Sequence, residues 1–388
     1  MIAPARPEYR VVVVGAGVIG LYTAYHLLKG GFGPVLVVDR GFLSSGASGR
    51  NGGGVRQQWE TQATVRLARE SVAAYRRFGS DFGYNVWFRQ GGYLFLASSA
   101  AEVGQLRSVH AVVQKEGLAS RLLAPNEVPR YAAGLALDGV HGASFLRSDG
   151  TLYPFPAIWG LYEAIRSLGG EVLLGTEVLS VARDAGRVSG VSFVNGSVKT
   201  SVVVNAAGGW SKEFSARAGL AVVNQPSRHE ILATEPLKPF LDPMVVRLSD
   251  GLYFSQTMRG EIVGGLTVPH PPGIGAGMAT SPHFLTSMAR ALSTLVPRLR
   301  SLGVLRAWSG FYDDTPDGLP VIGEDPRLTG FVHANGFGGH GFMLAPAAAQ
   351  RVAKSVMGEG TDLDPAMFAP GRFLGAPSPA TVERLQLG

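Results

Sequence analysis

A glycine turn near the start of the chain constrains its fold more than any other feature. The sequence Gly15-x-Gly17-x-x-Gly20 follows a short β-branched run and precedes a stretch typical of a helix. A second apolar run then ends in Asp39. Strand, glycine turn, helix and strand in this order form a βαβ unit. The sequence therefore predicts a parallel sheet whose first turn binds a dinucleotide.

Each glycine of this turn has a separate expected role. Gly15 permits the tight turn, Gly17 lets the backbone approach a pyrophosphate, and Gly20 lets the helix pack on the strand. Asp39 lies 19 residues beyond Gly20, where a carboxylate accepts hydrogen bonds from ribose hydroxyls. The alternative is an ordinary glycine turn followed by an incidental acid.

Length and composition limit the class of protein. A chain of 388 residues is longer than one hydrophobic core usually supports, so its length predicts two domains. The absence of cysteine excludes disulfides, thiolate metal sites and a flavin bonded through cysteine sulfur. The net charge of +6 is scattered rather than gathered in a basic tract, so we expect no nucleic-acid partner. No His and carboxylate cluster has metal-ligand spacing, so we expect no metal, and the composition favours a cytoplasmic protein.

Two further glycine-rich loops favour a flavin over a nicotinamide. The first, residues 44–54, follows the second predicted strand, where it is placed to wrap a dinucleotide. The second, residues 335–343, opens the last long predicted helix. A helix N-terminus directed at a flavin pyrimidine stabilises the negative charge that develops on reduction.

Five motifs in this order resemble those of the D-amino acid oxidase superfamily of FAD-dependent amine oxidoreductases. They are GAGVIG, SSGASGRNGGG, VVVNAAGGW, TPDGLPVIG and NGFGGHGFMLAP. The stretch from His229 to Gly265 is similar to the β subunits of heterotetrameric sarcosine oxidase and of archaeal dye-linked L-proline dehydrogenase. The resemblance covers essentially the whole chain.

The resemblance implies an α/β fold with a discontinuous Rossmann-like FAD-binding domain at residues 1–85, 143–215 and 310–388. An inserted α+β substrate domain, built on a mostly antiparallel sheet, would take residues 86–142 and 216–309. The motifs and the resemblance together predict the following FAD contacts: Gly15, Ala16, Gly17, Val18, Ile19, Gly20, Asp39, Arg40, Ser45, Ala47, Ser48, Arg50, Asn51, Gly52, Gly53, Gly54, Val178, Ala206, Ala207, Gly208, Trp210, Gly310, Gly336, Gly338, Gly339, His340, Gly341, Phe342 and Met343.

Four departures from the family pattern point away from the oxidases. Tyr312 stands where glycine oxidases and D-amino acid oxidases carry a carboxylate-binding Arg. Met343 replaces the corresponding Lys of monomeric sarcosine oxidases, and Ile262-Val263 stands where those enzymes carry an oxygen-activating Lys. Pro154 occupies the position of the histidine that anchors FMN in sarcosine oxidase β subunits. The resemblance therefore implies a dehydrogenase with non-covalent FAD.

The substrate carboxylate needs a cation or an equivalent set of donors. Arg56 is the best candidate by position, and His340 lies in the loop expected to face the flavin. Tyr253 resembles the tyrosine that covers the substrate in this superfamily. The residues expected at the substrate are thus Arg56, Tyr253, Tyr312 and His340, whereas His229 and Glu230 are expected to be structural.

The expected reaction is oxidation of an amino acid C–N bond by hydride transfer to flavin N5. A neutral amine passes its α-hydrogen as hydride, so no protein base is required. Proline or a related cyclic or N-substituted amino acid is the leading substrate, with an artificial dye or a membrane or electron-transfer carrier as acceptor. The alternatives are a sarcosine, glycine or D-amino acid oxidase, or a flavin-bound subunit active only within a complex. A homo-oligomer or a hetero-oligomeric dehydrogenase complex is the expected assembly.

Overall fold

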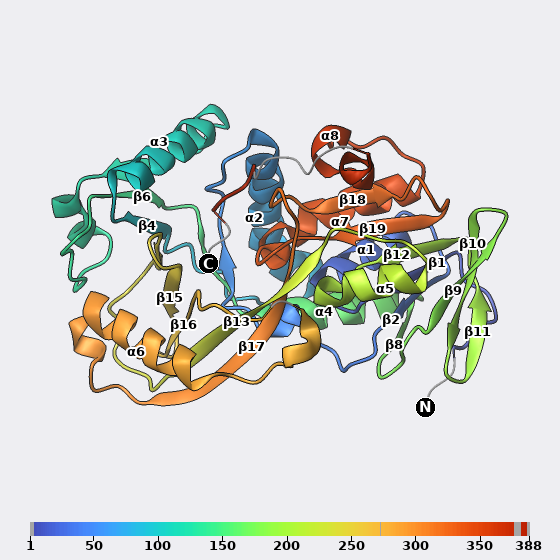
Figure 1. Ribbon diagram of the computed structural model, residues 1–388, viewed down its shortest axis with the longest axis horizontal. Coiled ribbons are helices and arrows are strands. Elements are labelled where there is room, and N and C mark those ends of the chain that lie inside the picture. The colour runs from blue at the N-terminus through green and yellow to red at the C-terminus, as the bar shows by residue number, and fades with distance from the viewer. Residues whose placement is uncertain (1–3, 272, 376–381, 386–388) are drawn as a thin grey trace.

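Two large β-sheets at opposite ends of the long axis organise the molecule (Figure 1). The computed structural model describes residues 4–271, 273–375 and 382–385. Parts of the predicted cofactor domain, at residues 1–3, 376–381 and 386–388, lie outside the described residues.

The first sheet has six strands and contains the βαβ unit predicted from the glycine turn. Five of its strands run parallel, and only the edge strand β18 is antiparallel to its neighbour. In spatial order the strands are β18 (Val321–Glu324), β19 (Phe331–Asn335), β12 (Val202–Asn205), β1 (Val11–Val14), β2 (Val35–Val38) and β8 (Glu171–Leu173).

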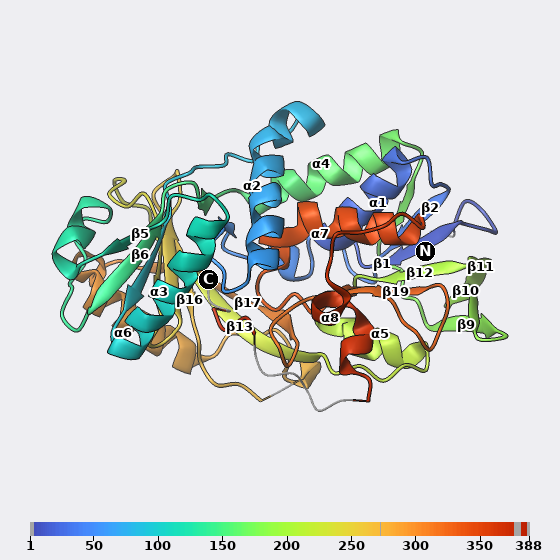
Figure 2. The same ribbon diagram turned by 90° about the horizontal axis from the view of Figure 1, so that it is seen from above.

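Both faces of this sheet are covered, which explains why strands β1 and β2 are apolar throughout. Val11 and Val13 point to a helical layer, and Val12 points to the opposite side. The helices are α1 (Val18–Lys29), α2 (Gln62–Phe82), α4 (Pro154–Ser167) and α7 (Gly341–Val356), seen side by side in Figure 2. The other face carries the three-stranded sheet β9 (Ser180–Asp184), β10 (Arg187–Phe193) and β11 (Gly196–Lys199), and α5 (Ser211–Arg217).

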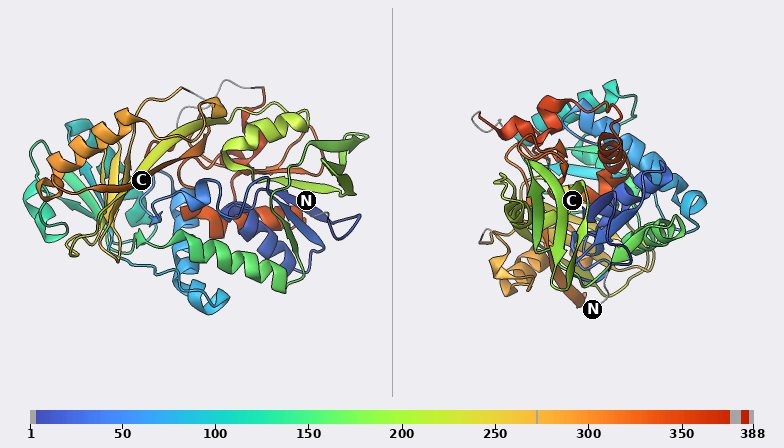
Figure 3. Two further views of the ribbon diagram at one scale, coloured as in Figure 1. Left: turned by 90° about the horizontal axis from the view of Figure 1, so that it is seen from below. Right: turned by 90° about the vertical axis from the view of Figure 1, so that its right-hand side faces the viewer.

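The second sheet has eight strands and is antiparallel except where β14 pairs with β4. In spatial order it contains β17 (Val304–Asp314), β13 (Gln225–Thr234), β16 (Ile262–Leu266), β15 (Leu252–Gln256), β14 (Met244–Arg247), β4 (Tyr93–Ala97), β6 (Gly142–Leu146) and β5 (Arg121–Leu123). Leu94 and Leu96 pack under α6 (Pro282–Leu295), whereas Tyr93 and Phe95 face the first core and α3 (Ala100–Lys115). Figure 3 shows α6 along this sheet.

Two short segments form a separate two-stranded sheet. Strand β3 (Gly54–Val55) pairs with β7 (Gly150–Thr151), and the small helix α8 (Pro365–Phe368) follows α7. The fold class predicted from the sequence is confirmed. The division into two domains stays a prediction, and its boundaries at 143 and 310 fall inside β6 and β17, two strands of the eight-stranded sheet.

Candidate active site

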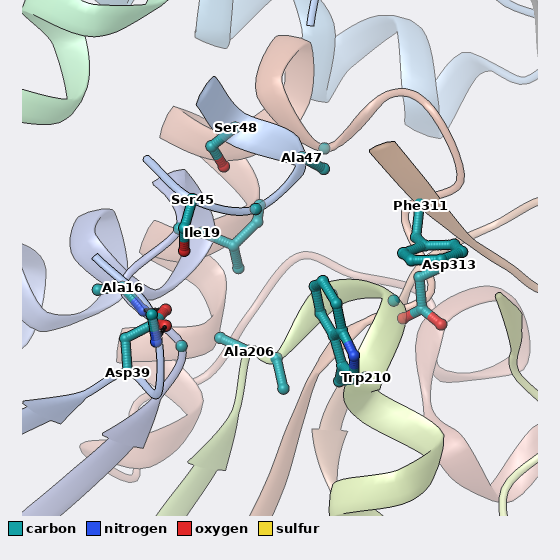
Figure 4. Close-up of a pocket in the computed structure, with 18 of the residues that line it drawn as sticks. Ala16, Ile19, Asp39, Ser45, Ala47, Ser48, Ala206, Trp210, Phe311 and Asp313 are labelled. Atoms are coloured by element: carbon teal, nitrogen blue, oxygen red, sulfur yellow. Dashed lines mark hydrogen bonds between the residues drawn. The ribbon is translucent and has the colours of Figure 1, made fainter. Parts of the chain in front are cut away.

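A cavity of about 740 Å³ runs between the carboxyl ends of the parallel strands and the eight-stranded sheet. This is the edge of an open α/β sheet where ligands bind, and the volume is that of a cofactor site. Figure 4 shows Ala16 and Asp39 on one side of the cavity and Trp210, Phe311 and Asp313 on the other.

Most residues predicted to contact FAD lie on the wall of this cavity. These are Gly15, Ala16, Gly17, Val18, Ile19, Asp39, Arg40, Ser45, Ala47, Ser48, Arg50, Asn51, Gly52, Gly54, Val178, Ala206, Ala207, Gly208, Trp210, Gly310, Gly336, Gly338, Gly339, Gly341, Phe342 and Met343. Gly20, Gly53 and His340 are not on the wall. Of the predicted substrate residues, Tyr253 and Tyr312 line the cavity and Arg56 does not. Their roles toward ligands stay predictions.

Two of the three glycines in this turn pack closely against the protein backbone, and the third has open space beside it. A Cβ on Gly15, whose φ is +114°, would lie 2.2 Å from the Ala206 carbonyl oxygen. A Cβ on Gly20 would lie 1.9 Å from the Gly15 carbonyl oxygen. On Gly17 it would meet only the Ser48 hydroxyl, at 3.1 Å. Gly17 is therefore the member of the turn that a ligand can approach.

The N-terminus of α1 fits an anionic group. Its N-cap residue, Gly17, has no side chain to cap the helix, and the first turn has no acidic residue. Its N–H groups and the positive end of its dipole thus face the cavity at Gly17, which is the arrangement that binds phosphates. Ser48 reaches over from the first glycine loop and accepts a hydrogen bond from the Val18 N–H at 2.9 Å.

Asp39 ends the second strand with both carboxylate oxygens engaged. It accepts hydrogen bonds from the Ala16 N–H at 2.8 Å and the Gly41 N–H at 2.7 Å. A carboxylate has about four acceptor sites, so these bonds leave room for ribose hydroxyls. Next to it, the Arg40 guanidinium lies 4.6 Å over the Trp210 ring. This end of the cavity is therefore suited to the adenosine half of a dinucleotide.

The first glycine loop is held rigid by its own side chains. Arg50 donates to the Ser45 carbonyl at 2.8 Å and to the Ser309 carbonyl of β17 at 3.0 Å. Asn51 donates to the Ser48 carbonyl at 2.6 Å and accepts from the Gly53 N–H at 2.7 Å. Gly53, with φ of +74°, supports the turn rather than the cavity wall.

The second glycine loop presents another helix N-terminus to the cavity. Gly336 and Gly338 have positive φ, and α7 has neither a side-chain cap nor an acidic first turn. The Asp313 carboxylate accepts from the Gly336 N–H at 2.7 Å and from the Asn224 side chain at 3.1 Å. Burial raises the pKa of Asp313 to about 7. Asp313 lines the cavity, although the sequence did not single it out.

The eight-stranded sheet closes the far end of the cavity with aromatic and apolar side chains. Tyr253 and Tyr312 are hydrogen-bonded through their hydroxyls, and Ile231 and Met244 lie beside them on the wall. Burial raises the pKa of Tyr312 to about 12, so both phenols stay neutral near pH 7. His229 also lines the cavity, with its ring stacked on Tyr312. The sequence prediction treated this histidine as structural.

Arg56 and His340 lie together outside the cavity wall. Arg56 is fully buried, and its guanidinium stacks over the Trp59 ring at 4.0 Å. One terminal nitrogen faces His340 Nε2 at 3.1 Å and donates to the Leu385 carbonyl. Burial first, and the Arg56 charge second, hold the pKa of His340 well below its ordinary value. A carboxylate-binding role for Arg56 stays a prediction.

The described residues fit FAD. Two uncapped helix N-termini open on one elongated cavity, and the glycine that faces the ligand leaves space for a pyrophosphate. The polar end carries Asp39, and the far end is closed by neutral rings. Within the described part of the chain, no group of three or more His, Asp or Glu side chains is arranged to hold a metal ion. Fold and site together define an FAD-type flavoprotein.

Comparison with known proteins agrees that the chain is an FAD-dependent flavoprotein. The family pattern described as FAD dependent oxidoreductase (DAO) matches residues 10–355, and the chain belongs to this family. It is an FAD-dependent amino acid oxidoreductase, as the sequence predicted. Relatives include the sarcosine oxidase subunit beta of Rhodobacter capsulatus, 31% identical over 95% of this chain and 91% of the relative.

Solved structures of the same fold include the L-proline dehydrogenase of P. horikoshii. It is 32% identical, with a TM-score of 0.89 over 96% of this chain and 98% of that chain. The glycine oxidase of Geobacillus kaustophilus is 25% identical, with a TM-score of 0.87 over 95% and 100% of the two chains. Among the residues described, none of the helices combines the length and apolarity needed to cross a membrane.

Proposed function

We propose that this chain is a dehydrogenase for L-proline or a related cyclic or N-substituted amino acid. The observation that carries the proposal is the neutral, apolar end of the cavity, where Ile231, Met244 and the Tyr253–Tyr312 pair enclose space next to the second glycine loop. Such a wall suits a small ring whose carbons need apolar contact. The similarity to the P. horikoshii L-proline dehydrogenase over nearly the whole chain supports the assignment.

The residues of this end would orient the substrate and exclude water. FAD, when bound, accepts the hydride from the substrate Cα. The tyrosine hydroxyls are donors that stay neutral, so they can bind the substrate carboxylate without adding charge. The α7 N-terminus supplies a positive dipole near the cofactor. Fixing the Cα–H in line with its acceptor is the main contribution expected of the protein.

Arg56 remains our proposed electrostatic partner of the substrate carboxylate, acting from beside the wall. Burial raises the pKa of the Tyr312 hydroxyl, and the Arg56 charge acts in the opposite direction and lowers it. Arg56 does not line the cavity, and one of its terminal nitrogens donates to the Leu385 carbonyl. Tyr312 is therefore the first donor that a substrate in this cavity meets.

The FAD is proposed to be non-covalent. The chain has no cysteine, and Pro154, which begins α4, cannot form the histidyl link. Heating or acid should therefore release all the flavin into the supernatant. Yellow protein in the precipitate would contradict this.

A sarcosine or glycine oxidase is the second candidate, favoured by the 31% identity to a sarcosine oxidase subunit beta. The same relative supports a hetero-oligomeric complex as the working form, and the lack of cysteine suits a reducing cytoplasm. To test the function, purified protein is mixed anaerobically with L-proline, D-proline, sarcosine and glycine while flavin absorbance is followed. Bleaching by L-proline supports the proposal. Bleaching by sarcosine or glycine alone, with peroxide formed on admission of oxygen, would establish the oxidase.

A further inference from the structure

His229 is a cavity-facing histidine whose nitrogens the protein leaves unused. It lies on β13 opposite Gly310 of β17, and its ring stacks on Tyr312 with centroids 3.7 Å apart and planes 16° apart. Neither ring nitrogen has a hydrogen-bond partner among residues 4–271, 273–375 and 382–385. The ring itself is therefore fixed while its polar edge is available to a ligand.

Three histidines with buried side chains have polar partners instead. His270 pairs with a carboxylate at 2.7 Å, His333 with another at 3.0 Å, and His340 faces a guanidinium at 3.1 Å. His229 is partly exposed on the cavity wall, so a polar edge that the protein leaves without a partner is available to hydrogen-bond a ligand there. The structural role first expected for His229 explains the stacking on Tyr312. It does not explain why both ring nitrogens lack hydrogen-bond partners among the described residues.

The surroundings keep His229 neutral. Burial, assisted by nearby His270, lowers its pKa to about 4. The Tyr312 phenol stacked on its ring and the nearby His340 imidazole are both neutral near pH 7. A neutral imidazole has one N–H and one lone pair. It can therefore accept a hydrogen bond near pH 7.

We propose that His229 is a positioning residue that accepts a hydrogen bond from the N–H of the substrate amine. The inference rests on the proposed function and narrows the substrate class to amines that carry an N–H when neutral, which are primary and secondary amines. The stacking on Tyr312 fixes the imidazole beside the phenol pair. Amine and carboxylate of one substrate would thus be bound by adjacent residues of β13 and β17.

The first test uses the parent enzyme and needs no variant. L-proline and N-methyl-L-proline differ by a methyl group that removes the amine N–H from the neutral form. We expect the half-saturating concentration for anaerobic flavin bleaching to be at least about tenfold higher for the N-methyl compound, the factor that corresponds to one hydrogen bond. If sarcosine or glycine is the amine oxidised, its N,N-dimethyl counterpart replaces the N-methylproline.

The second test removes the acceptor. His229→Phe keeps a ring on Tyr312 but has no nitrogen, and His229→Gln keeps an acceptor oxygen. The control is His283→Phe, at an exposed position of α6. FAD content and melting temperature are measured first in every variant. We expect His229→Phe to lose most of the discrimination against the N-methyl compound and to need about tenfold more substrate. His229→Gln should recover part of both effects, and the control should match the parent.

The outcomes separate the two claims. If no amino acid bleaches the parent flavin, the proposed function fails, and the inference fails with it. If the parent is bleached but uses the N-methyl compound equally well, only the inference is overturned. The same holds if folded, FAD-loaded His229→Phe retains the parent's discrimination. If His229→Phe does not fold, the comparison of the two substrates in the parent and in His229→Gln decides.

Discussion

Gly17 and Gly20 belong to one turn but face different neighbours, so alanine at each should have different effects. A Cβ on Gly20 would meet a backbone oxygen at 1.9 Å and the Val13 side chain at 3.2 Å. Neither neighbour can rotate away, because one is backbone and the other, Val13, is fully buried. Gly20→Ala therefore forces α1 to move off the sheet. Gly17→Ala meets only the Ser48 hydroxyl.

The expected change in the free energy of unfolding follows from these contacts. Overpacking of a core costs about 1–3 kcal/mol, and the gain in helix propensity offsets up to about 1 kcal/mol. The close approach in Gly20→Ala lies at the severe end of this range, so we expect a net loss of about 2 kcal/mol. For a chain of 388 residues that corresponds to roughly 2–3 °C in melting temperature. Gly17→Ala should change the stability of the apoprotein by less than about 0.5 kcal/mol.

The assay is thermal unfolding of apoprotein by circular dichroism, followed by FAD titration of folded protein by fluorescence quenching. We expect Gly17→Ala to bind FAD at least about tenfold more weakly, because its methyl group fills the approach to the α1 N-terminus. Gly17→Val should abolish binding. Apoprotein of Gly20→Ala as stable as the parent would refute the packing argument, and unchanged FAD affinity in Gly17→Ala would refute the phosphate site.

Three other predictions concern separate parts of the molecule. Reoxidation by oxygen should be slow, because the buried Ile262 and adjacent Val263 supply no cation to stabilise developing superoxide; peroxide formed as fast as a dye is reduced would contradict this. Arg56→Ala should raise the KM strongly with FAD retained, corresponding to about 2–5 kcal/mol, and Arg56→Lys should recover part of this loss; a KM like the parent's would place the carboxylate partner elsewhere. Burial raises the pKa of Asp149 from 3.8 to about 7, so its contribution to stability is complete below pH 3.8 and is lost as the pH rises to about 7. Relative to Asp149→Asn, the parent should therefore lose a few kcal/mol over that interval in urea unfolding, and parallel curves would show that the shift is absent.

Local patterns predicted the parts of the fold that depend on nearby residues. The glycine turn and its flanking strands lie within thirty residues and needed no long-range information. Arg56 could not be placed in the same way. Its guanidinium is held by the Leu385 carbonyl, 329 residues away, and by His340, 284 residues away. No spacing in the sequence shows that these segments meet.

The position of His229 on the cavity wall was not predicted, for a related reason. Strand alternation places it on the same face of β13 as Ile231, and that signal was readable from the sequence. Which face looks into the cavity, however, depends on how the eight-stranded sheet sits against the first glycine loop. The loop reaches the sheet at Gly52, where a Cβ would touch Ile231 and Tyr253 at 3.5 and 3.6 Å. That contact is tertiary and leaves no trace in local spacing.

The strand order of the six-stranded sheet has a consequence for synthesis of the chain. Strand β1 lies between β2 and β12, and β19 pairs with the other edge of β12. Val11 therefore cannot pair until Val202 has been synthesised, and Val203 cannot pair with β19 until Phe331 has been synthesised. Sheets that depend on such distant pairings fold slowly and expose apolar strands meanwhile. The cavity also needs residues up to Met343, so FAD cannot stabilise the chain during most of translation. Chains cut before α7 should therefore aggregate and depend on chaperones, whatever the supply of flavin.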